Sequence, residues 1–463
     1  MPSSSRRLAV AACLLLGTGL ASPASGGAAR SVPHGRLETL QGYAVLSLDG
    51  TPQQMGTACG RLLGPIIQRV IRDLITDGIG SDPEAYRNML AGSRVMEAYQ
   101  PEAYRAELKA LAEAAGVAYP DLLLLQYFGD VRRCIDGAGS SPLCTAIAML
   151  PPLTRDDACL VARNLDYFDH GVGEYASLLV HYRPKGKIPF VTVTWAGIIN
   201  GWTLLNARGV VTANNTPFGA QSQSLRGVST CFLLRQVAEH ATTVNEALEI
   251  VRKAKRACGT NMLVASGRPP DAAVIEFDHE RLVVRRPREG FLGAANHFEL
   301  LNADRPPATS PPEGRVGAAF AAAQAAAGKL DLSVNVAGAE GVPIVGMNLH
   351  SAMIDATHLR LRLAIGAIPA CHRPYRAFRF TTEGLTAGLS GEPAPTPRGA
   401  AGPPAPAPAP PEMDFSDYLA LVMGVLMVGF VGITVVRLVR TALTGERPTA
   451  LFDEPSREDT HWR

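Results

Sequence analysis

The stretch Cys144-Thr-Ala-Ile-Ala-Met-Leu150 is the most informative part of this chain, because a cysteine opens an apolar, strand-like run. A second strand-like segment, residues 158–167, contains Arg163-Asn-Leu-Asp166. Between the two lies Pro151-Pro-Leu-Thr-Arg-Asp-Asp157, which is rich in turn-forming residues. A simple hairpin centred near Leu153 and Thr154 would place Cys144 opposite Arg163.

These residue types suit a cysteine nucleophile. A guanidinium beside a thiol lowers the pKa of the thiol and raises the fraction of reactive thiolate. If the chain were cut before Cys144, a carboxylate such as Asp166 would orient the freed α-amino group, which then acts as the general base. Arg163 and Asp166 would point to opposite faces of a regular strand. We therefore expect that the strand ends at Asp166 or that a bulge intervenes.

Both ends of the chain differ from a globular core. Residues 1–27 contain Arg6-Arg7, an apolar run and then small residues, which is typical of a secretory signal peptide. Residues 418–436 are uncharged and apolar, and are about as long as a membrane-spanning helix. Acidic residues precede this span and arginines follow it, which predicts that the tail, residues 437–463, is cytoplasmic. The expected location is a single-pass membrane protein whose catalytic part lies outside the cytoplasm, in the periplasm if the source is bacterial.

Composition and apolar periodicity divide the remaining chain into three parts. Residues 37–143 are predicted to be mainly helical, and residues 144–386 form the predicted catalytic segment. Residues 387–412 are rich in Pro and Ala, so they are expected to act as an extended spacer between the catalytic part and the membrane helix.

Charge, cysteine content and motifs narrow the function classes. A formal net charge of +2 and a pI near 8.1 indicate neither nucleic acid nor another strongly charged partner. Seven cysteines follow the predicted signal peptide, and this odd number leaves at least one unpaired in an oxidising compartment. CxxC, HExxH, phosphate-loop and GxSxG motifs are absent from the sequence, so no metal and no cofactor are predicted. The sequence does not indicate an oligomeric state.

The order of the predicted elements indicates a layered α+β fold, in which antiparallel sheets are covered by helices. Helices are expected at residues 60–75, 101–115, 120–128, 229–239 and 243–255. Strands are expected at residues 144–150, 158–167, 176–182, 189–195, 209–213, 261–265, 272–277 and 282–286, with a last pair within 351–366 and 374–380.

Several motifs, in this order, resemble the acyl-coenzyme A:6-aminopenicillanic acid acyltransferase family of N-terminal-nucleophile (Ntn) cysteine hydrolases, relatives of the conjugated bile acid hydrolases and acid ceramidases. The likeness spans about residues 40–380. The motifs are Gly50-Thr-Pro-Gln-Gln-Met-Gly56 with Gly60, Ser141-Pro-Leu-Cys144-Thr, Ala162-Arg163-Asn164-Leu165-Asp166-Tyr167, Asn206-Ala-Arg-Gly209 to Asn214-Asn215, Gly259-Thr-Asn261-Met-Leu, and Ala294-Ala-Asn296-His297-Phe298.

The resemblance implies a four-layer αββα sandwich and a role for each matching residue. Cleavage of the Leu143–Cys144 bond would free Cys144 as the nucleophile, and its own α-amino group would be the base. Arg163 and Asp166 would tune the thiolate and hold the amine. Asn215 resembles the asparagine of the oxyanion hole, and Asn261 resembles a second polar residue of such sites. The substrate implied is a small-molecule acyl amide, which is hydrolysed or gives up its acyl group to an acceptor.

The sequence departs from the family pattern at two places. Leu143 precedes the nucleophile, where relatives often have glycine. The later arginine of the family has no clear counterpart, and Arg315, after the Pro-rich stretch of residues 305–312, is the one candidate.

Two alternatives remain, and the substrate is an expectation only. In the first alternative, the chain is a papain-like protease that uses Cys144 with His297. In the second, it is an inactive membrane-anchored ectodomain that binds a partner. For the leading interpretation, the predicted membrane anchor and apolar composition favour long-chain N-acyl amides as substrates.

Overall fold

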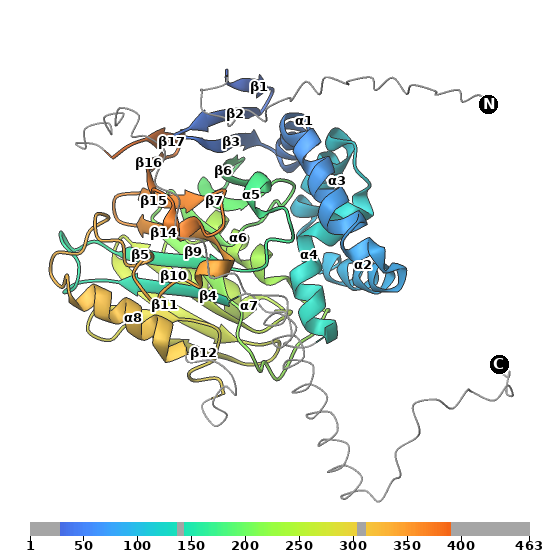
Figure 1. Ribbon diagram of the computed structural model, residues 1–463. Coiled ribbons are helices and arrows are strands. Elements are labelled where there is room, and N and C mark those ends of the chain that lie inside the picture. The colour runs from blue at the N-terminus through green and yellow to red at the C-terminus, as the bar shows by residue number, and fades with distance from the viewer. Residues whose placement is uncertain (1–27, 137–142, 303–311, 390–463) are drawn as a thin grey trace, which may run out of the picture. The chain divides into compact units, whose positions relative to one another are not determined.

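Two β-sheets packed face to face form the centre of the structure (Figure 1). The computed structural model describes residues 28–136, 143–302 and 312–389. Sheet A has the strand order β1 (Arg30–Val32), β2 (Gly35–Leu40), β3 (Tyr43–Gly50), β6 (Ser177–Pro184), β7 (Phe190–Trp195), β8 (Thr203–Asn206), β9 (Val210–Asn215), β10 (Thr260–Gly267), β11 (Pro270–Phe277) and β12 (Leu282–Arg285). Its neighbouring strands are antiparallel except for β3 and β6, which are parallel.

Sheet B is antiparallel throughout the described residues. Its strand order is β13 (Phe291–Ala294), β4 (Leu143–Met149), β5 (Leu160–Asp166), β14 (Asn348–Asp355), β15 (Arg360–Ile365), β16 (Arg376–Thr381) and β17 (Gly384–Ala387). The strand that carries Cys144 therefore lies between β13 and β5.

Helices cover the outer face of each sheet (Figure 1). On sheet A lie α1 (Pro52–Val70), α6 (Thr230–His240) and α7 (Val244–Lys253). Packed on α1 and on one another are its extension η1 (Ile71–Thr76), η2 (Ile79–Ser81), α2 (Pro83–Glu97), α3 (Glu102–Ala115) and α4 (Tyr119–Asp136). On sheet B lies α8 (Pro312–Gln324). The short helices α5 (Gly173–Ala176), η4 (Val345–Met347) and η5 (Ala370–His372) lie in connections.

Side-chain alternation explains why these layers form. On β9, Val211 and Ala213 pack between the sheets, whereas Val210 packs beneath the helices. On β4, Ala146 and Ala148 face sheet A, whereas Ile147 and Met149 pack on the side of α8. Both faces of these central strands are thus buried, and the expected α+β sandwich is confirmed.

The glycines noted at the start of the family-like region permit close helix packing. A Cβ atom on Gly56 would lie 2.2 Å from the carbonyl oxygen of Glu107, and one on Gly60 would lie 2.7 Å from the backbone nitrogen of Ala115. Only glycine fits where α1 approaches the backbone of α3 this closely. These glycines therefore serve the fold of the helical layer.

Most of the predicted elements are present, and several additional ones are found. Residues 37–143 contain the helices α1 to α4, and they also supply most of β2 and all of β3 to sheet A. The sequence analysis did not predict α2, β8, β13, α8 or β17. These are short, irregularly patterned or alanine-rich segments, in which apolar periodicity is weak.

The predicted signal peptide and the predicted membrane helix, residues 1–27 and 418–436, lie outside the described residues. The linker and cytoplasmic tail also fall there, apart from residues 387–389. Among the helices of the described ranges, none combines the length and apolar character that a membrane span requires.

Candidate active site

Cys144 lies on β4 in the predicted hairpin, but the pairing is shifted by two residues. Cys144 pairs with Leu165, and Arg163 pairs with Ala146. The prediction that Cys144 lies directly opposite Arg163 was therefore wrong, because the connection between β4 and β5 is longer than a hairpin centred at Leu153 and Thr154 allows. Residues two apart on a strand share a face, so the side chains of Cys144 and Arg163 still project toward the same side.

Asn296 and Arg315 hold the backbone of Cys144 from both sides. The backbone N–H of Cys144 donates to Oδ1 of Asn296 over 2.8 Å, and its carbonyl oxygen accepts from Nη1 of Arg315 over 2.8 Å. Nη2 of Arg315 also donates to Oδ1 of Asn296 over 2.8 Å, which joins the two residues. Asn296 in turn donates from Nδ2 to the carbonyl oxygen of Thr216. The nucleophile candidate is thereby fixed relative to β9.

Arg163 is a fully buried cation whose described hydrogen bonds go to neutral groups. Its Nη1 donates to Oδ1 of Asn215 over 2.8 Å, and its Nε donates to Oγ1 of Thr203 over 3.3 Å. Behind Thr203 lies His350, whose pKa burial holds well below its ordinary value, so that this ring is neutral. Because these partners carry no negative charge, the field of Arg163 acts on the thiol beside it.

Asp166 is the last residue of β5, which agrees with the expectation that the strand either ends at Asp166 or contains a bulge. An irregularity of the bulge type is present as well, but on the neighbouring strand β14, where the pairing with β5 shifts between Asn348 and His350. The carboxylate of Asp166 accepts from Nδ2 of Asn348 over 2.7 Å and from the backbone N–H of Ile344 over 3.1 Å. Asp166 pairs with Leu143, so its carboxylate lies beside the bond that was predicted to be cut.

The charges around Cys144 act on its pKa in opposite directions. Burial raises the pKa of the Cys144 thiol, and Asp166 adds to this effect, whereas Arg163 and Arg315 lower it. Burial dominates, and the side chain is inaccessible to solvent in the uncut chain. If the thiol became exposed, the effect of burial on its pKa would weaken, and the lowering of the pKa by Arg163 and Arg315 would then matter more.

Asn215 and Asn261 lie next to each other but have different surroundings. They face each other across the β9–β10 pair. Nδ2 of Asn215 makes one long contact, 3.5 Å, with the carbonyl oxygen of Asn261, so this amide keeps donor capacity for a ligand. Nδ2 of Asn261 donates to the carbonyl oxygens of Ala295 and His297. Asn261 thus positions the segment that presents Asn296 to Cys144.

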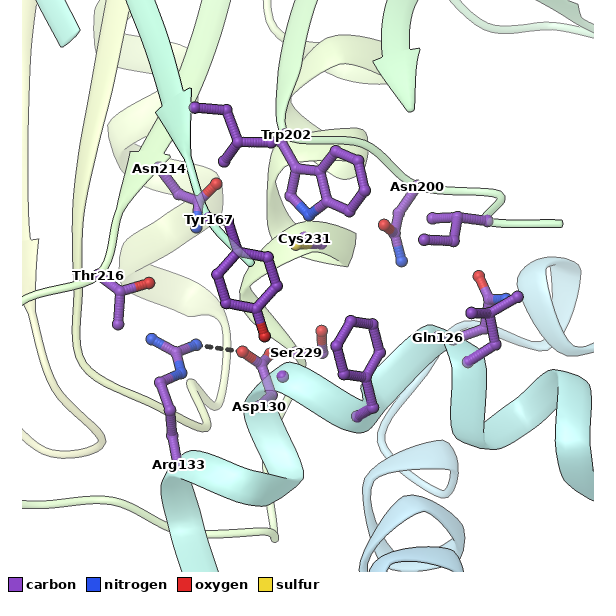
Figure 2. Close-up of a pocket in the computed structure, with 15 residues that line it drawn as sticks. Gln126, Asp130, Arg133, Tyr167, Asn200, Trp202, Asn214, Thr216, Ser229 and Cys231 are labelled. Atoms are coloured by element: carbon purple, nitrogen blue, oxygen red, sulfur yellow. Dashed lines mark hydrogen bonds and ion pairs between the residues drawn. The ribbon is translucent and has the colours of Figure 1, made fainter. Parts of the chain in front are cut away.

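A cavity of about 60 Å³ lies near Cys144, although Cys144 itself does not line it (Figure 2). It is lined by Leu125, Gln126, Phe128, Gly129, Asp130, Arg133, Leu165, Tyr167, Ile198, Asn200, Trp202, Asn214, Thr216, Ser229 and Cys231. Leu165 is the direct pairing partner of Cys144. Burial raises the pKa values of Tyr167 and Cys231, and Cys144 adds a smaller contribution to both shifts. In Figure 2, α4 presents Asp130 and Arg133 on one side, and Trp202 and Asn200 lie across from them.

Two asparagines of this cavity have buried atoms without hydrogen-bond partners. These atoms are Nδ2 of Asn200, a donor, and Oδ1 of Asn214, an acceptor. Buried polar atoms are normally paired, so an unpaired donor and an unpaired acceptor that line one cavity point to a ligand with the complementary groups. An amide has both. Neither asparagine was singled out for this role in the sequence.

Residues 153–315 match the model of the family described as acyl-coenzyme A:6-aminopenicillanic acid acyl-transferase. The resemblance to this acyltransferase family is confirmed. The matched range includes Arg163, Asp166, Asn215 and Asn261, and it ends at Arg315.

Two curated relatives are similar to the chain over about half of its length. An uncharacterized protein of Archaeoglobus fulgidus is 24% identical over 279 residues, which cover 55% of this chain and 47% of that protein. Protein dcd1A of Dictyostelium discoideum is 23% identical over 270 residues, 51% of this chain and 58% of that protein. The chain thus spans about half the length of these two relatives.

Three solved structures are also similar. The Caenorhabditis elegans ortholog of N-acylethanolamine-hydrolyzing acid amidase has 16% identity and a TM-score of 0.38, with 46% of this chain and 93% of that chain covered. A variant of conjugated bile acid hydrolase from Clostridium perfringens has 12% identity and a TM-score of 0.39, with 53% and 96% covered. Penicillin V acylase from Agrobacterium tumefaciens has 11% identity and a TM-score of 0.36, with 53% and 98% covered.

The sequence analysis did not assign a role to Asn296, and it proposed Arg315 only as a substitute for a missing arginine. Asn296 belongs to the Ala-Asn-His-Phe motif, in which only His297 was given a possible role, as the partner of Cys144 in the papain-like alternative. The available signal was an asparagine directly after two alanines at the end of an apolar run, since a buried polar side chain needs partners.

The raised pKa of Asp166 leads to a pH-dependent stability. Burial raises the pKa of Asp166 from 3.8 to about 6. Folding therefore favours the protonated carboxyl, so this stabilisation is fully present below about pH 4 and is lost as the pH rises through about 6. We expect the free energy of unfolding of uncut Cys144→Ala protein to fall by up to about 3 kcal/mol relative to Cys144→Ala/Asp166→Asn over this interval.

Urea unfolding of both proteins at several pH values measures this difference. The comparison cancels the buried histidines that titrate in the same range, because both proteins contain them. A difference that stays constant from pH 4 to pH 6 would mean that Asp166 ionises at its ordinary pKa.

Proposed function

We propose that this protein is a self-activating cysteine amidohydrolase or acyltransferase, in which the nucleophile is Cys144. The observation that carries the proposal is the position of Cys144. Its backbone is held by Asn296 and Arg315, and its thiol lies beside the buried cation of Arg163. A merely structural cysteine in a strand needs neither a buried guanidinium at its thiol nor polar side chains on its backbone.

Activation begins with attack of the Cys144 thiol on the carbonyl carbon of Leu143. The thioester that forms releases the Cys144 nitrogen, which takes up the thiol proton and becomes an amine. Water then hydrolyses the thioester, leaving a carboxylate on Leu143 and a free thiol on Cys144. Asn296 and Arg315 keep the nitrogen and the carbonyl group of Cys144 in place during these steps.

The cut protein then acts on its substrate with the same thiol. The α-amino group of Cys144 takes the thiol proton, and the sulfur attacks the carbonyl carbon of the bound amide. Nδ2 of Asn215 donates to the developing oxyanion, and Arg163 holds this asparagine by its oxygen. The amine leaves with the proton, and water or a second amine removes the acyl group from the cysteinyl thioester.

A long-chain N-acyl amide is the substrate that the surroundings of the thiol support best. Phe128 lines the cavity near Cys144 and also lines a second cavity of about 330 Å³. Leu74, Ile79, Ala85 and Met89 line the second cavity together with Phe128, and Ser81, Asp82, Arg132 and His170 supply its polar part. An acyl chain attached at the thiol can thus extend past Phe128 between η1 and α2, whereas the amide lies near Asn200 and Asn214.

A series of N-acyl amides of increasing chain length tests this function. Because each buried methylene contributes about 0.8 kcal/mol, two added methylenes are expected to raise kcat/KM roughly tenfold until the second cavity is filled. Met89→Trp should shorten the preferred chain, and Lys109→Ala on the surface of α3 serves as the control. Equal rates for all chain lengths, or equal turnover of unacylated peptides, would reject the lipid amide while leaving the cysteine mechanism in place.

The two alternatives from the sequence make different predictions in the same assay. A papain-like protease would cleave peptides with an uncut chain, and an inactive ectodomain would turn over neither substrate. Cys144→Ala should abolish turnover under the proposal and under the protease alternative, so the state of the chain separates these two.

A further inference from the structure

Two cysteines that take no part in the reaction described above lie close together. Sγ of Cys134 is 3.2 Å from Sγ of Cys258. Cys134 is in the last turn of α4, and Cys258 precedes β10. A disulfide bond is about 2.05 Å long, so the two sulfur atoms would have to approach by roughly 1 Å more.

The backbones that carry this pair are already held together. Nη1 of Arg133 donates to the carbonyl oxygen of Gly259 over 3.0 Å, and Sγ of Cys258 lies 3.5 Å from the carbonyl oxygen of Asp130. The carboxylate of Asp130 pairs with Arg133 and accepts from the backbone N–H of Thr230 over 2.8 Å. These contacts keep the last turn of α4 beside the segment that precedes β10, so the two sulfur atoms stay within reach of each other.

We propose that Cys134 and Cys258 form a disulfide that joins the two fragments of the cut protein. Cys134 belongs to the fragment that ends at Leu143, and Cys258 belongs to the fragment that begins at Cys144. The linking role rests on the cleavage proposed above, whereas formation of the bond does not.

The oxidant is a disulfide, either oxidised glutathione or the active-site disulfide of a thiol–disulfide oxidoreductase. Cys134 is partly exposed and Cys258 is buried, so the oxidant reaches Cys134 first. The Cys134 thiolate attacks the oxidant and forms a mixed disulfide, releasing one thiol. Cys258 then attacks the sulfur of Cys134 and releases the second thiol. The two cysteine protons end on the two thiols of the reduced oxidant.

The bond would also stabilise the wall of the candidate active site. Asp130 and Arg133, which Figure 2 shows on α4, line the cavity beside Cys144. They lie within about one turn of Cys134. A link from Cys134 to the start of β10 would hold this end of α4 after the chain before Cys144 has been cut.

Peptide mapping of the full-length protein after treatment with oxidised glutathione tests the proposal. Free thiols are first alkylated under denaturing conditions without reductant. We expect a linked peptide pair containing Cys134 and Cys258, lighter by two hydrogen atoms than the reduced peptides and lost after reduction. On a denaturing gel without reductant, the two fragments should run as one band, and with reductant they should separate.

Cysteine variants show whether a negative result comes from absence of the disulfide or from absence of chain cleavage. Cys134→Ser should separate the fragments without reductant, whereas Cys59→Ala, which removes another thiol of the same fragment, should not. Uncut Cys144→Ala protein should contain the same linked peptides. If they are present there while the wild-type chain stays uncut, the disulfide stands and the cleavage fails. Alkylation of both Cys134 and Cys258 in wild-type and Cys144→Ala protein would overturn the disulfide.

Discussion

We expect Cys144→Ala protein to remain a single chain and wild-type protein to be cut between Leu143 and Cys144. The alanine variant lacks the sulfur that must attack the Leu143 carbonyl. The hydroxyl of Thr145, also on β4, lies one residue further along and is engaged with Nη1 of Arg315 over 3.0 Å. The expected effect is complete loss of cleavage. Intact-mass measurement and N-terminal sequencing report both the cut and its position.

A second buried cysteine provides the control for this experiment. Cys159 precedes β5 and packs between the sheets, away from the Leu143–Cys144 bond. Cys159→Ala should therefore still be cut. A wild-type preparation that contains only one chain, beginning near residue 28, would exclude the Ntn mechanism. A cut that persists in Cys144→Ala would show that another protease makes it.

Asn215→Ala is expected to lower kcat by about 10²- to 10³-fold with little change in KM, because its amide would stabilise charge that exists only in the transition state. The adjacent Asn214→Ala is the matched control. Asn214 lines the cavity and has an unpaired oxygen, so its loss should mainly raise KM. Steady-state kinetics with one N-acyl amide measure both changes.

The thiol reactivity of Asn215→Ala separates two roles of this residue. If Asn215 donates to the oxyanion, the pH profile for alkylation of Cys144 in the cut protein should be nearly unchanged. If Asn215 serves only to hold Arg163, the profile should shift to higher pH, because a displaced guanidinium no longer lowers the pKa of the thiol. A normal kcat with a raised KM would contradict the oxyanion role.

Local patterns were sufficient to predict the hairpin and the residues it carries. Residues 144–150 and 158–167 are apolar runs of strand length separated by turn-forming residues, so their type and pairing follow from short-range preferences. The odd spacing of Arg163 and Asp166 on one strand was also enough to predict that the strand must end or bulge there. These inferences concern neighbours in sequence, where backbone geometry leaves few choices.

The register of the hairpin could not be predicted from these local patterns. A longer connection between β4 and β5 moves the partner of Cys144 from Arg163 to Leu165. The length of this connection depends on contacts with other segments, and the backbone N–H of Arg155 donates to the carbonyl oxygen of Leu330, far along the chain. Such a contact leaves no periodic signal in the sequence.

The surroundings of Cys144 were decided by the tertiary structure. Asn296 and Arg315 reach its backbone from positions 152 and 171 residues away, after β13 has paired with β4 and α8 has packed on the outer face of sheet B. Thr203 of sheet A reaches Arg163 of sheet B only because the two sheets pack face to face, and the same hydroxyl contacts His350 of β14. Hydrophobic alternation specifies which face of each strand is buried, but it does not specify which distant polar group lies opposite. That choice depends on how complete sheets and helices pack, because each buried donor and acceptor must find its partner in the same arrangement.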